Sequence, residues 1–189
     1  VIALGADAAG SPGTSERPSR ASLPRELVGV DYILTVGTVE PRKNHATLLD
    51  AFDRLVAADR TEHLVVVGRP GWHNDEVIER LATHQELGRR LHWFRAADDD
   101  LLATLYDHAR VVAVASITEG YGLPVIEAMS HGVPVVSSNG GALVEAGGDL
   151  VTHVDALDVD AWVRALDRHL RDDTFVAMRR DALAGYAAP

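Results

Sequence analysis

The chain has 189 residues, of which 47% are hydrophobic and 24% charged, an ordinary composition for one globular domain with its own core. A formal net charge of −10, without any long basic run, argues against a general nucleic-acid-binding role. The lack of cysteine excludes disulfides and thiolate metal sites. No apolar run approaches the ~20 residues of a membrane span, and no signal peptide is visible, so we expect a cytoplasmic protein.

Strand and helix patterns alternate along most of the chain. Residues 1–30 come first and include a stretch rich in Gly, Ser and Pro that is typical of a mobile segment. We expect strands at 32–36, 63–67, 91–94, 110–116, 133–137 and 150–154, and helices at 44–59, 75–86, 99–109, 123–129, 143–146 and 158–171. Because the strands are apolar without alternation, the pattern predicts an α/β fold with a doubly wound parallel sheet covered on both faces.

Glycine and polar residues follow the predicted strands in five loops, at 37–44, 68–71, 95–98, 116–122 and 137–141. In a parallel sheet, ligands bind beyond the carboxyl ends of the strands. The topology therefore predicts one crevice built from separate loops, although many doubly wound proteins share this feature.

The fourth of these loops carries the most informative pattern. Glu119 and Glu127 stand eight positions apart around a Gly-Tyr-Gly-Leu-Pro turn, and the helix that follows is apolar except at Glu127. A carboxylate there needs a partner, which is either a hydroxyl-rich ligand or an internal group such as a backbone N–H or an Arg. Gly120 and Gly122 leave the backbone bare at a helix N-terminus, where a phosphate binds well. A diphosphate between two polyols, as in a nucleotide sugar, would fit this layout.

The first loop adds positive charge at the start of a helix. Arg42 and Lys43 lie where the helix dipole slightly disfavours cations, which points to an anionic ligand. The alternative is a solvated pair of surface charges. The loop matches neither a P-loop nor the G-x-G-x-x-G fingerprint.

The run Asp98-Asp99-Asp100 imitates a metal-binding D-x-D motif. Because it directly precedes a predicted helix, we interpret it as a cap for free backbone N–H groups. The histidines show no ligand spacing typical of metal sites, so we predict no metal.

The stretch from Ser116 to Val135 resembles the E-x7-E signature of retaining GT-B glycosyltransferases of the glycosyltransferase 4 family. The matching positions are Ser116, Glu119, Gly120, Gly122, Leu123, Pro124, Glu127, Ala128, Met129, Gly132, Pro134 and Val135, with Tyr121 where Phe is usual. The first loop is similar to the family's diphosphate-binding loop, and Lys43 matches its lysine. Many relatives carry an Arg directly after Gly37. Here that position is Thr38, which leaves open whether Arg42 replaces it.

The resemblance implies a role for each matching position. Glu119 and Lys43 would be the catalytic residues, with Glu119 on the hydroxyls of the transferred sugar and Lys43 on the diphosphate. Gly37, Thr38 and Arg42 would belong to the diphosphate loop. The backbone of Gly120, Tyr121, Gly122 and Leu123 would face phosphate or sugar oxygens. Glu127 would bind the ribose, and the loop at Phe94 to Ala96, with Phe94 and Arg95 as its binding residues, would contact the nucleobase edge.

The resemblance further implies the C-terminal half of a GT-B fold, with a donor-binding Rossmann-like domain at 31–172. Residues 1–30 would be a linker from a missing N-terminal acceptor domain, and residues 173–189 a truncated helical tail. The implied function is metal-independent, retaining transfer of a hexose from a nucleotide-diphosphate sugar to a lipid-linked or glycan acceptor, without a cofactor. Any membrane attachment would come through the missing domain. A GT-B-like nucleotide-sugar epimerase or phosphorylase and a binding-only nucleotide domain are the alternatives.

Overall fold

A computed structural model describes residues 23–188 of the chain. The strands are β1 (Tyr32–Val36), β2 (His63–Val67), β3 (Leu91–Phe94), β4 (Val111–Val114), β5 (Val135–Ser138) and β6 (Thr152–Val154). The α-helices are α1 (His45–Ala57), α2 (Asp75–Thr83), α3 (Asp99–His108), α4 (Leu123–Ser130), α5 (Leu143–Gly147), α6 (Val159–Arg171) and α7 (Asp173–Leu183). Short 3-10 turns occupy Arg25–Leu27, Pro41–Lys43 and Gly148–Leu150.

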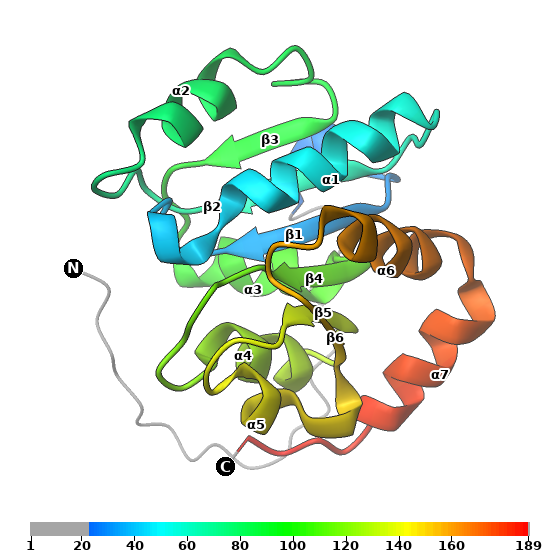
Figure 1. The fold of residues 1–189 in the computed structure, drawn as a ribbon. Coiled ribbons are helices and arrows are strands. Elements are labelled where there is room, and N and C mark those ends of the chain that lie inside the picture. Colours follow the sequence, from blue (N-terminus) through cyan, green and yellow to red (C-terminus); the bar gives the residue numbers. More distant parts are fainter. Residues whose placement is uncertain (1–22, 189) are drawn as a thin grey trace.

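The six strands form one sheet in the order β3-β2-β1-β4-β5-β6, and every pairing is parallel (Figure 1). This order is that of a Rossmann-like fold, in which the direction of winding reverses between β1 and β4. The predicted α/β class and doubly wound parallel sheet are therefore confirmed. The sequence pattern had not specified the strand order.

Helices cover both faces of the sheet, and each face has its own apolar core. On one face, residues such as Phe52 of α1, Leu81 of α2 and Trp162 of α6 pack on Ile33 and Val66 of the sheet. On the other face, side chains of α3, α4 and α5 pack on the alternate strand positions, including Leu34, Val65 and Val112. Because successive side chains point to opposite faces, burial on both sides explains the unalternating apolar strands.

The core also takes in residues from both ends of the described part of the chain. Leu23 and Leu27 are buried against the α3 face, and Val176 and Leu183 of α7 are buried as well. Packing thus begins before residue 31 and continues beyond residue 172. Residues 1–22, which hold most of the predicted linker, lie outside the described residues, and the domain boundaries remain a prediction.

The strand predictions agree with the structure to within a few residues, whereas one helix end is wrong. The helix expected to run to residue 86 ends at Thr83, because His84 takes an extended backbone conformation. The Nε2 of His84 lies 2.8 Å from Oδ1 of Asp53 on α1, a contact between the end of α2 and another helix that no local pattern shows. Among residues 23–188, no helix has both the length and the apolar character needed to cross a membrane.

Candidate active site at the carboxyl ends of β1 and β4

The loops that leave the strands at their carboxyl ends are hydrogen-bonded to one another. The N–H of Gly37 donates to the carbonyl of Val67 at 2.9 Å, which joins the ends of β1 and β2. The N–H of Ile117 donates to the carbonyl of Arg42 at 2.8 Å, which joins the loops after β1 and β4. The second contact crosses the point where the winding reverses, the usual ligand site of such sheets.

The loop after β1 holds Lys43 in a fixed place beside that point. Asn44, in the left-handed region at φ 54°, ends the Pro41–Lys43 turn and donates from Nδ2 to the carbonyls of Ala115 and Ala156, at 3.2 and 2.7 Å. Gly37 has φ +149°, and a Cβ there would lie 3.3 Å from Cε of Lys43. A glycine at this position therefore lets the lysine side chain lie close against the loop.

Glu119 is the centre of a charged cluster. Its Oε1 accepts from Lys43 Nζ and, at 2.9 Å, from Ser116 Oγ, while its Oε2 accepts from Arg42 Nη1 at 3.0 Å. The side chains of Lys43 and Glu119 are only 11% and 9% exposed. Burial raises the pKa of Glu119, but the hydrogen bond and charge of Lys43, together with Ser116 and Arg42, outweigh burial and hold the pKa below its ordinary value. Glu119 is therefore a carboxylate at neutral pH.

The start of α4 lies beside this cluster. No side chain caps the helix, so backbone N–H groups at its start are left for a ligand or solvent, although Pro124 in the first turn has no N–H to offer. Gly122 has φ +69°, and a Cβ there would lie 2.7 Å from Cβ of Ala146 on α5. A pocket of about 370 Å³ is lined by Arg42, Lys43, Glu119, Gly120, Tyr121, Gly122, Leu123 and Pro124. It combines cations with a helix N-terminus, a combination that suits a phosphate.

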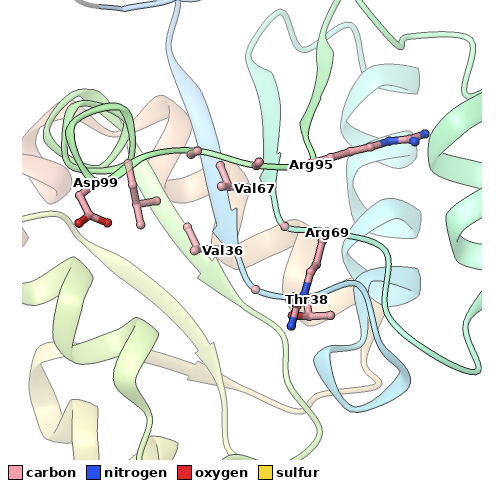
Figure 2. Close-up of a pocket in the computed structure, with 11 residues that line it drawn as sticks. Val36, Thr38, Val67, Arg69, Arg95 and Asp99 are labelled. Atoms are coloured by element: carbon pink, nitrogen blue, oxygen red, sulfur yellow. The ribbon is translucent and has the colours of Figure 1, made fainter. Parts of the chain in front are cut away.

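A second pocket of about 320 Å³ opens at the ends of β1, β2 and β3 (Figure 2). It is lined by Val36, Gly37, Thr38, Val67, Gly68, Arg69, Arg95, Ala96, Ala97, Asp99 and Leu102. Figure 2 shows Arg69 extending from the loop after β2 toward Thr38. The Arg95 guanidinium instead lies 4.6 Å from the centroid of the Trp93 ring. The mostly small and apolar wall, with charged groups at its rim, suits a flat ring such as a nucleobase.

Glu127 lies one turn further along α4 than Pro124 and is exposed, so the expected cost of burying this carboxylate does not arise. It does have an internal partner, although neither a backbone N–H nor an Arg. The hydroxyl of Tyr106 on α3 donates to Oε2 of Glu127 at 3.0 Å. Burial, followed by the charge and hydrogen bond of Glu127, raises the pKa of Tyr106 well above its ordinary value.

The structure brings most of the predicted site residues together in two neighbouring pockets that share one loop. Gly37, Thr38 and Arg95 line the smaller pocket, and Arg42, Lys43, Glu119 and the 120–123 turn line the larger. Phe94 lines neither pocket and packs partly buried against the α3-side core. Glu127 lies outside both linings, on the helix whose first turn forms one wall.

Sequence reasoning missed several residues around these pockets. Arg69 lies in a loop that was predicted to reach the crevice, so its position was a usable signal. Asp99 and Leu102 of α3 gave no comparable signal, because first-turn and apolar helix positions have ordinary structural roles. Tyr106 falls on the apolar face of α3, where an aromatic residue indicates only packing.

The aspartate run before α3 acts as predicted. The Asp98 side chain accepts a hydrogen bond from the N–H of Leu101 at 2.8 Å and so caps the helix. Within the described residues, no three His, Asp or Glu side chains are grouped so that they could hold a metal ion.

A Rossmann-like sheet with cations and an uncapped helix at its winding reversal is the layout of a nucleotide-binding domain. The family model of glycosyl transferases group 1 matches residues 25–187. The chain belongs to this glycosyltransferase family, which confirms the resemblance to glycosyltransferases seen in the sequence and is consistent with the glycosyltransferase 4 family.

Two curated mannosyltransferases of Escherichia coli are similar in sequence. The chain is 40% identical over 154 residues to O-antigen chain mannosyltransferase B, a match that covers 79% of the chain and 39% of that protein. It is 38% identical over 134 residues to the serotype-specific mannosyltransferase WbdA, covering 70% of the chain and 16% of that protein. The chain therefore spans well under half the length of these relatives.

Solved structures share the fold. A glycosyltransferase from Rickettsia africae superposes with a TM-score of 0.72 at 22% identity, over 82% of this chain and 42% of that one. The α,α-trehalose 6-phosphate synthase of Burkholderia multivorans gives a TM-score of 0.72 at 17% identity, over 84% and 39%. These neighbours are GT-B glycosyltransferases, so the predicted half of a GT-B fold is confirmed.

Proposed function

We propose that this chain is the donor-binding domain of a retaining, metal-independent glycosyltransferase that moves a hexose from a nucleotide-diphosphate sugar to an acceptor hydroxyl. One observation carries the proposal. Lys43, Arg42, Glu119 and the uncapped start of α4 line a single pocket at the reversal between β1 and β4. Such a pocket offers cations and N–H groups for a diphosphate and a carboxylate for sugar hydroxyls.

The two pockets and α4 give each part of the donor a place. The diphosphate would lie between Lys43 and the start of α4, with the transferred sugar on Glu119. The ribose would lie on Glu127, and the base in the pocket lined by Arg95 and Ala97. Arg69, directed toward Thr38, would supply a cation near the position where many relatives have an arginine.

Transfer breaks the bond between the anomeric carbon and the diphosphate, so negative charge develops on the departing diphosphate. Lys43 and Arg42 would stabilise that charge in the transition state more than in the bound donor, which lowers the barrier. Metal-bound chemistry is not needed for this step, because fixed cations and N–H groups supply the same electrostatic stabilisation. Glu119 stays ionised and holds a sugar hydroxyl.

The names of the sequence relatives support a hexose donor, since two of them are called mannosyltransferases. Because the chain spans 39% of the length of O-antigen chain mannosyltransferase B, we assign the acceptor site to a further domain beyond this chain. A lipid-linked or glycan acceptor would bind there, and any contact with a membrane would be made by that domain.

Calorimetry tests donor binding directly. The chain is titrated with UDP, GDP and ADP, each with and without EDTA, and at least one is expected to bind equally well in both conditions. Lys43→Met should weaken that binding about 10- to 100-fold, since a hydrogen bond to a charged group is worth about 1.5–3 kcal/mol. Arg54→Met is the matched control, because Arg54 pairs with Asp160 across α1 and α6, away from the pocket.

Chemical labelling gives an independent readout at the same position. Lys43 is the only lysine in the chain, so amine-selective acylation followed by peptide mass spectrometry reports on this one side chain. The nucleotide that binds should slow acylation of Lys43. Binding without protection of Lys43 would contradict the proposal. An absolute requirement for a divalent ion would contradict it too and would make Asp98-Asp99-Asp100 a candidate metal site.

A further inference from the structure

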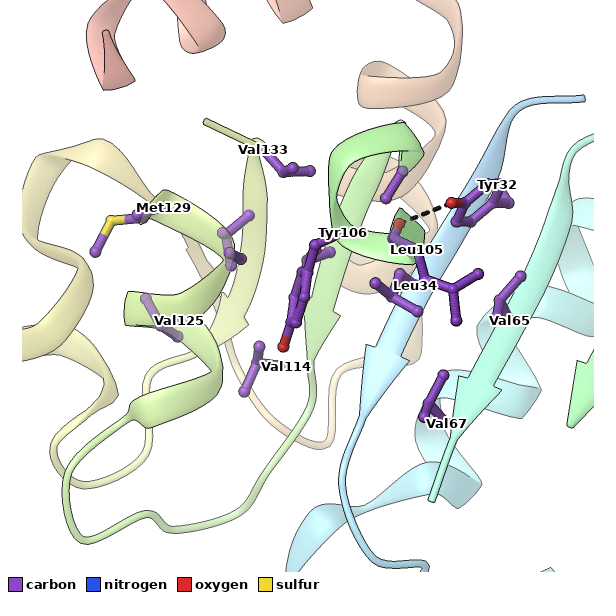
Figure 3. Close-up of a cluster of buried hydrophobic side chains, with 14 of the residues drawn as sticks. Tyr32, Leu34, Val65, Val67, Leu105, Tyr106, Val114, Val125, Met129 and Val133 are labelled. Atoms are coloured by element: carbon purple, nitrogen blue, oxygen red, sulfur yellow. Dashed lines mark hydrogen bonds between the residues drawn. The ribbon is translucent and has the colours of Figure 1, made fainter. Parts of the chain in front are cut away.

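The ring of Tyr106 is buried between two helices, with 2% of the residue exposed. Figure 3 shows the ring among the apolar side chains of this core, with its hydroxyl directed toward the end of the sheet at which Val114 lies. On its other side the ring stacks on His131, with centroids 5.0 Å apart and planes at 14°. Nδ1 of His131 in turn lies 2.7 Å from Oδ1 of Asp107. Because the ring is packed on both sides, the Tyr106 hydroxyl is held in one position.

That hydroxyl holds one oxygen of Glu127. Tyr106 comes from α3 and donates to Oε2 of Glu127 on α4 at 3.0 Å. Glu127 is exposed, and a glutamate at such a position normally samples several rotamers. Within residues 23–188, Tyr106 is the one hydrogen-bonding partner of the Glu127 carboxylate, so Oε1 stays available to a ligand while Oε2 is held.

The contact differs from that of the other tyrosine buried beside α3. Tyr32 is also fully buried, but its hydroxyl donates to the backbone carbonyl of Leu105 at 2.7 Å (Figure 3). A backbone carbonyl would satisfy a buried hydroxyl and serve packing alone. Tyr106 instead donates to a flexible carboxylate on the helix that begins at the larger pocket. Its raised pKa keeps the hydroxyl protonated, so it remains a donor at all ordinary pH values.

We propose that Tyr106 is a positioning residue that fixes the Glu127 carboxylate for recognition of the ribose hydroxyls of the donor. The proposal rests on the assignment of Glu127 to the ribose in the proposed function. With Oε2 held by Tyr106, Oε1 is presented to the ribose in one orientation, and the entropy of ordering Glu127 is lost on folding and not on binding. The consequence is sharper discrimination between a ribose and a 2′-deoxyribose.

Affinities for paired nucleotides test this role. Whichever of UDP, GDP and ADP binds the wild-type chain most tightly is compared with its 2′-deoxy counterpart, and the ratio of the two dissociation constants is recorded. Tyr106→Phe should reduce this ratio by about three- to tenfold, as expected for one lost hydrogen bond. Tyr32→Phe, which removes an equally buried hydroxyl from the same core, should leave the ratio unchanged, and urea unfolding of both variants compares their stability.

A double-mutant cycle separates positioning from general packing. Glu127→Ala should lower the ratio, and adding Tyr106→Phe to Glu127→Ala should have no further effect. If Glu127→Ala lowers the ratio but Tyr106→Phe does not, the role of Tyr106 is refuted while the proposed function stands. If Glu127→Ala leaves the ratio unchanged, the ribose assignment is wrong and the role of Tyr106 falls with it. An equal loss in Tyr32→Phe and Tyr106→Phe would reduce the effect to packing.

Discussion

Lys43 and Glu119 form an ion pair with each other, which affects how each would bind a donor. Both side chains are mostly buried, and burying either charge without the other would cost roughly several kcal/mol. An incoming diphosphate would take over part of the charge compensation of Lys43. Arg42, about half exposed and ion-paired with both Glu40 and Glu119, can keep Glu119 paired while this exchange occurs.

The two glutamates of the signature should have separable effects. Glu127→Ala should weaken binding of both the nucleoside diphosphate and the nucleotide sugar, since they share the ribose, by a loss of about 1.5–3 kcal/mol. Glu119→Ala should spare the nucleoside diphosphate, because it leaves Lys43 free for phosphate, and should reduce discrimination among nucleotide sugars. Calorimetry with the free nucleotide and a panel of its hexose conjugates measures both effects. Equal weakening of the two ligands by both substitutions would show that the assignment of Glu119 to the sugar is wrong.

At this scale, the sequence predicted residues that belong to a motif and missed those that act through a tertiary contact. Lys43 and Glu119 could be assigned because loop and helix signals surround them, and the structure brings them into one pocket. Tyr106 could not be assigned, because its partner Glu127 lies on another helix and its own helix face is apolar. Phe94 was placed near the base by family resemblance alone; its side chain packs partly buried against the α3-side core, and its contact with a base stays a prediction.

The position of α4 depends on the residue at which the helix starts. The helix starts after Gly122, whose φ of +69° is unfavourable for any residue with a Cβ and whose neighbour is Ala146 of α5. The approach of α4 to α5 and the shape of the larger pocket therefore depend on the same residue. Gly120, two positions earlier, does not have a positive φ, and a Cβ added there would point into open space.

This pair of glycines yields a matched test. Gly122→Ala should destabilise the fold by about 2 kcal/mol, from the left-handed backbone and the close contact with Ala146. Gly120→Ala should leave the free energy of unfolding within about 0.5 kcal/mol of the wild type, the usual range for a surface change. Urea unfolding measures both. Equal stability of the two variants would contradict the geometry at the start of α4.

Element positions followed well from local patterns, and the errors have tertiary causes. Strands were recognisable because burial on both faces removes polar residues from most of their length. The helix predicted to reach residue 86 stops at Thr83, where His84 is extended and its side chain contacts Asp53 of α1. The capping role of Asp98 was predictable, since a cap depends only on neighbours three residues away.

For the whole molecule, the sequence predicted the edge of the sheet at which the two pockets lie, but not how the strands are ordered. Every predicted loop at the carboxyl ends followed from the alternation of strands and helices. The order β3-β2-β1-β4-β5-β6 depends on long-range pairing, and it is this order that brings the Lys43 loop and the Glu119 loop together. Family resemblance also predicted that Lys43 and Glu119 lie in one site, but it did not give the strand order that brings their loops together.

Catalysis by residues 1–189 alone tests whether the donor and acceptor sites belong to different domains. In the proposed function the chain binds the donor, while the acceptor site belongs to another domain, so residues 1–189 should bind a nucleotide sugar and transfer nothing beyond slow hydrolysis. Orienting two substrates lowers a barrier by up to about 7–11 kcal/mol, and a chain that holds only one substrate lacks that contribution. Transfer of radiolabelled sugar to lipid-linked and glycan acceptors measures the outcome, with and without a separately expressed N-terminal half taken from a relative. Restoration of transfer by the added half supports the division of roles. Full transfer by residues 1–189 without it would show that the acceptor site lies within this chain.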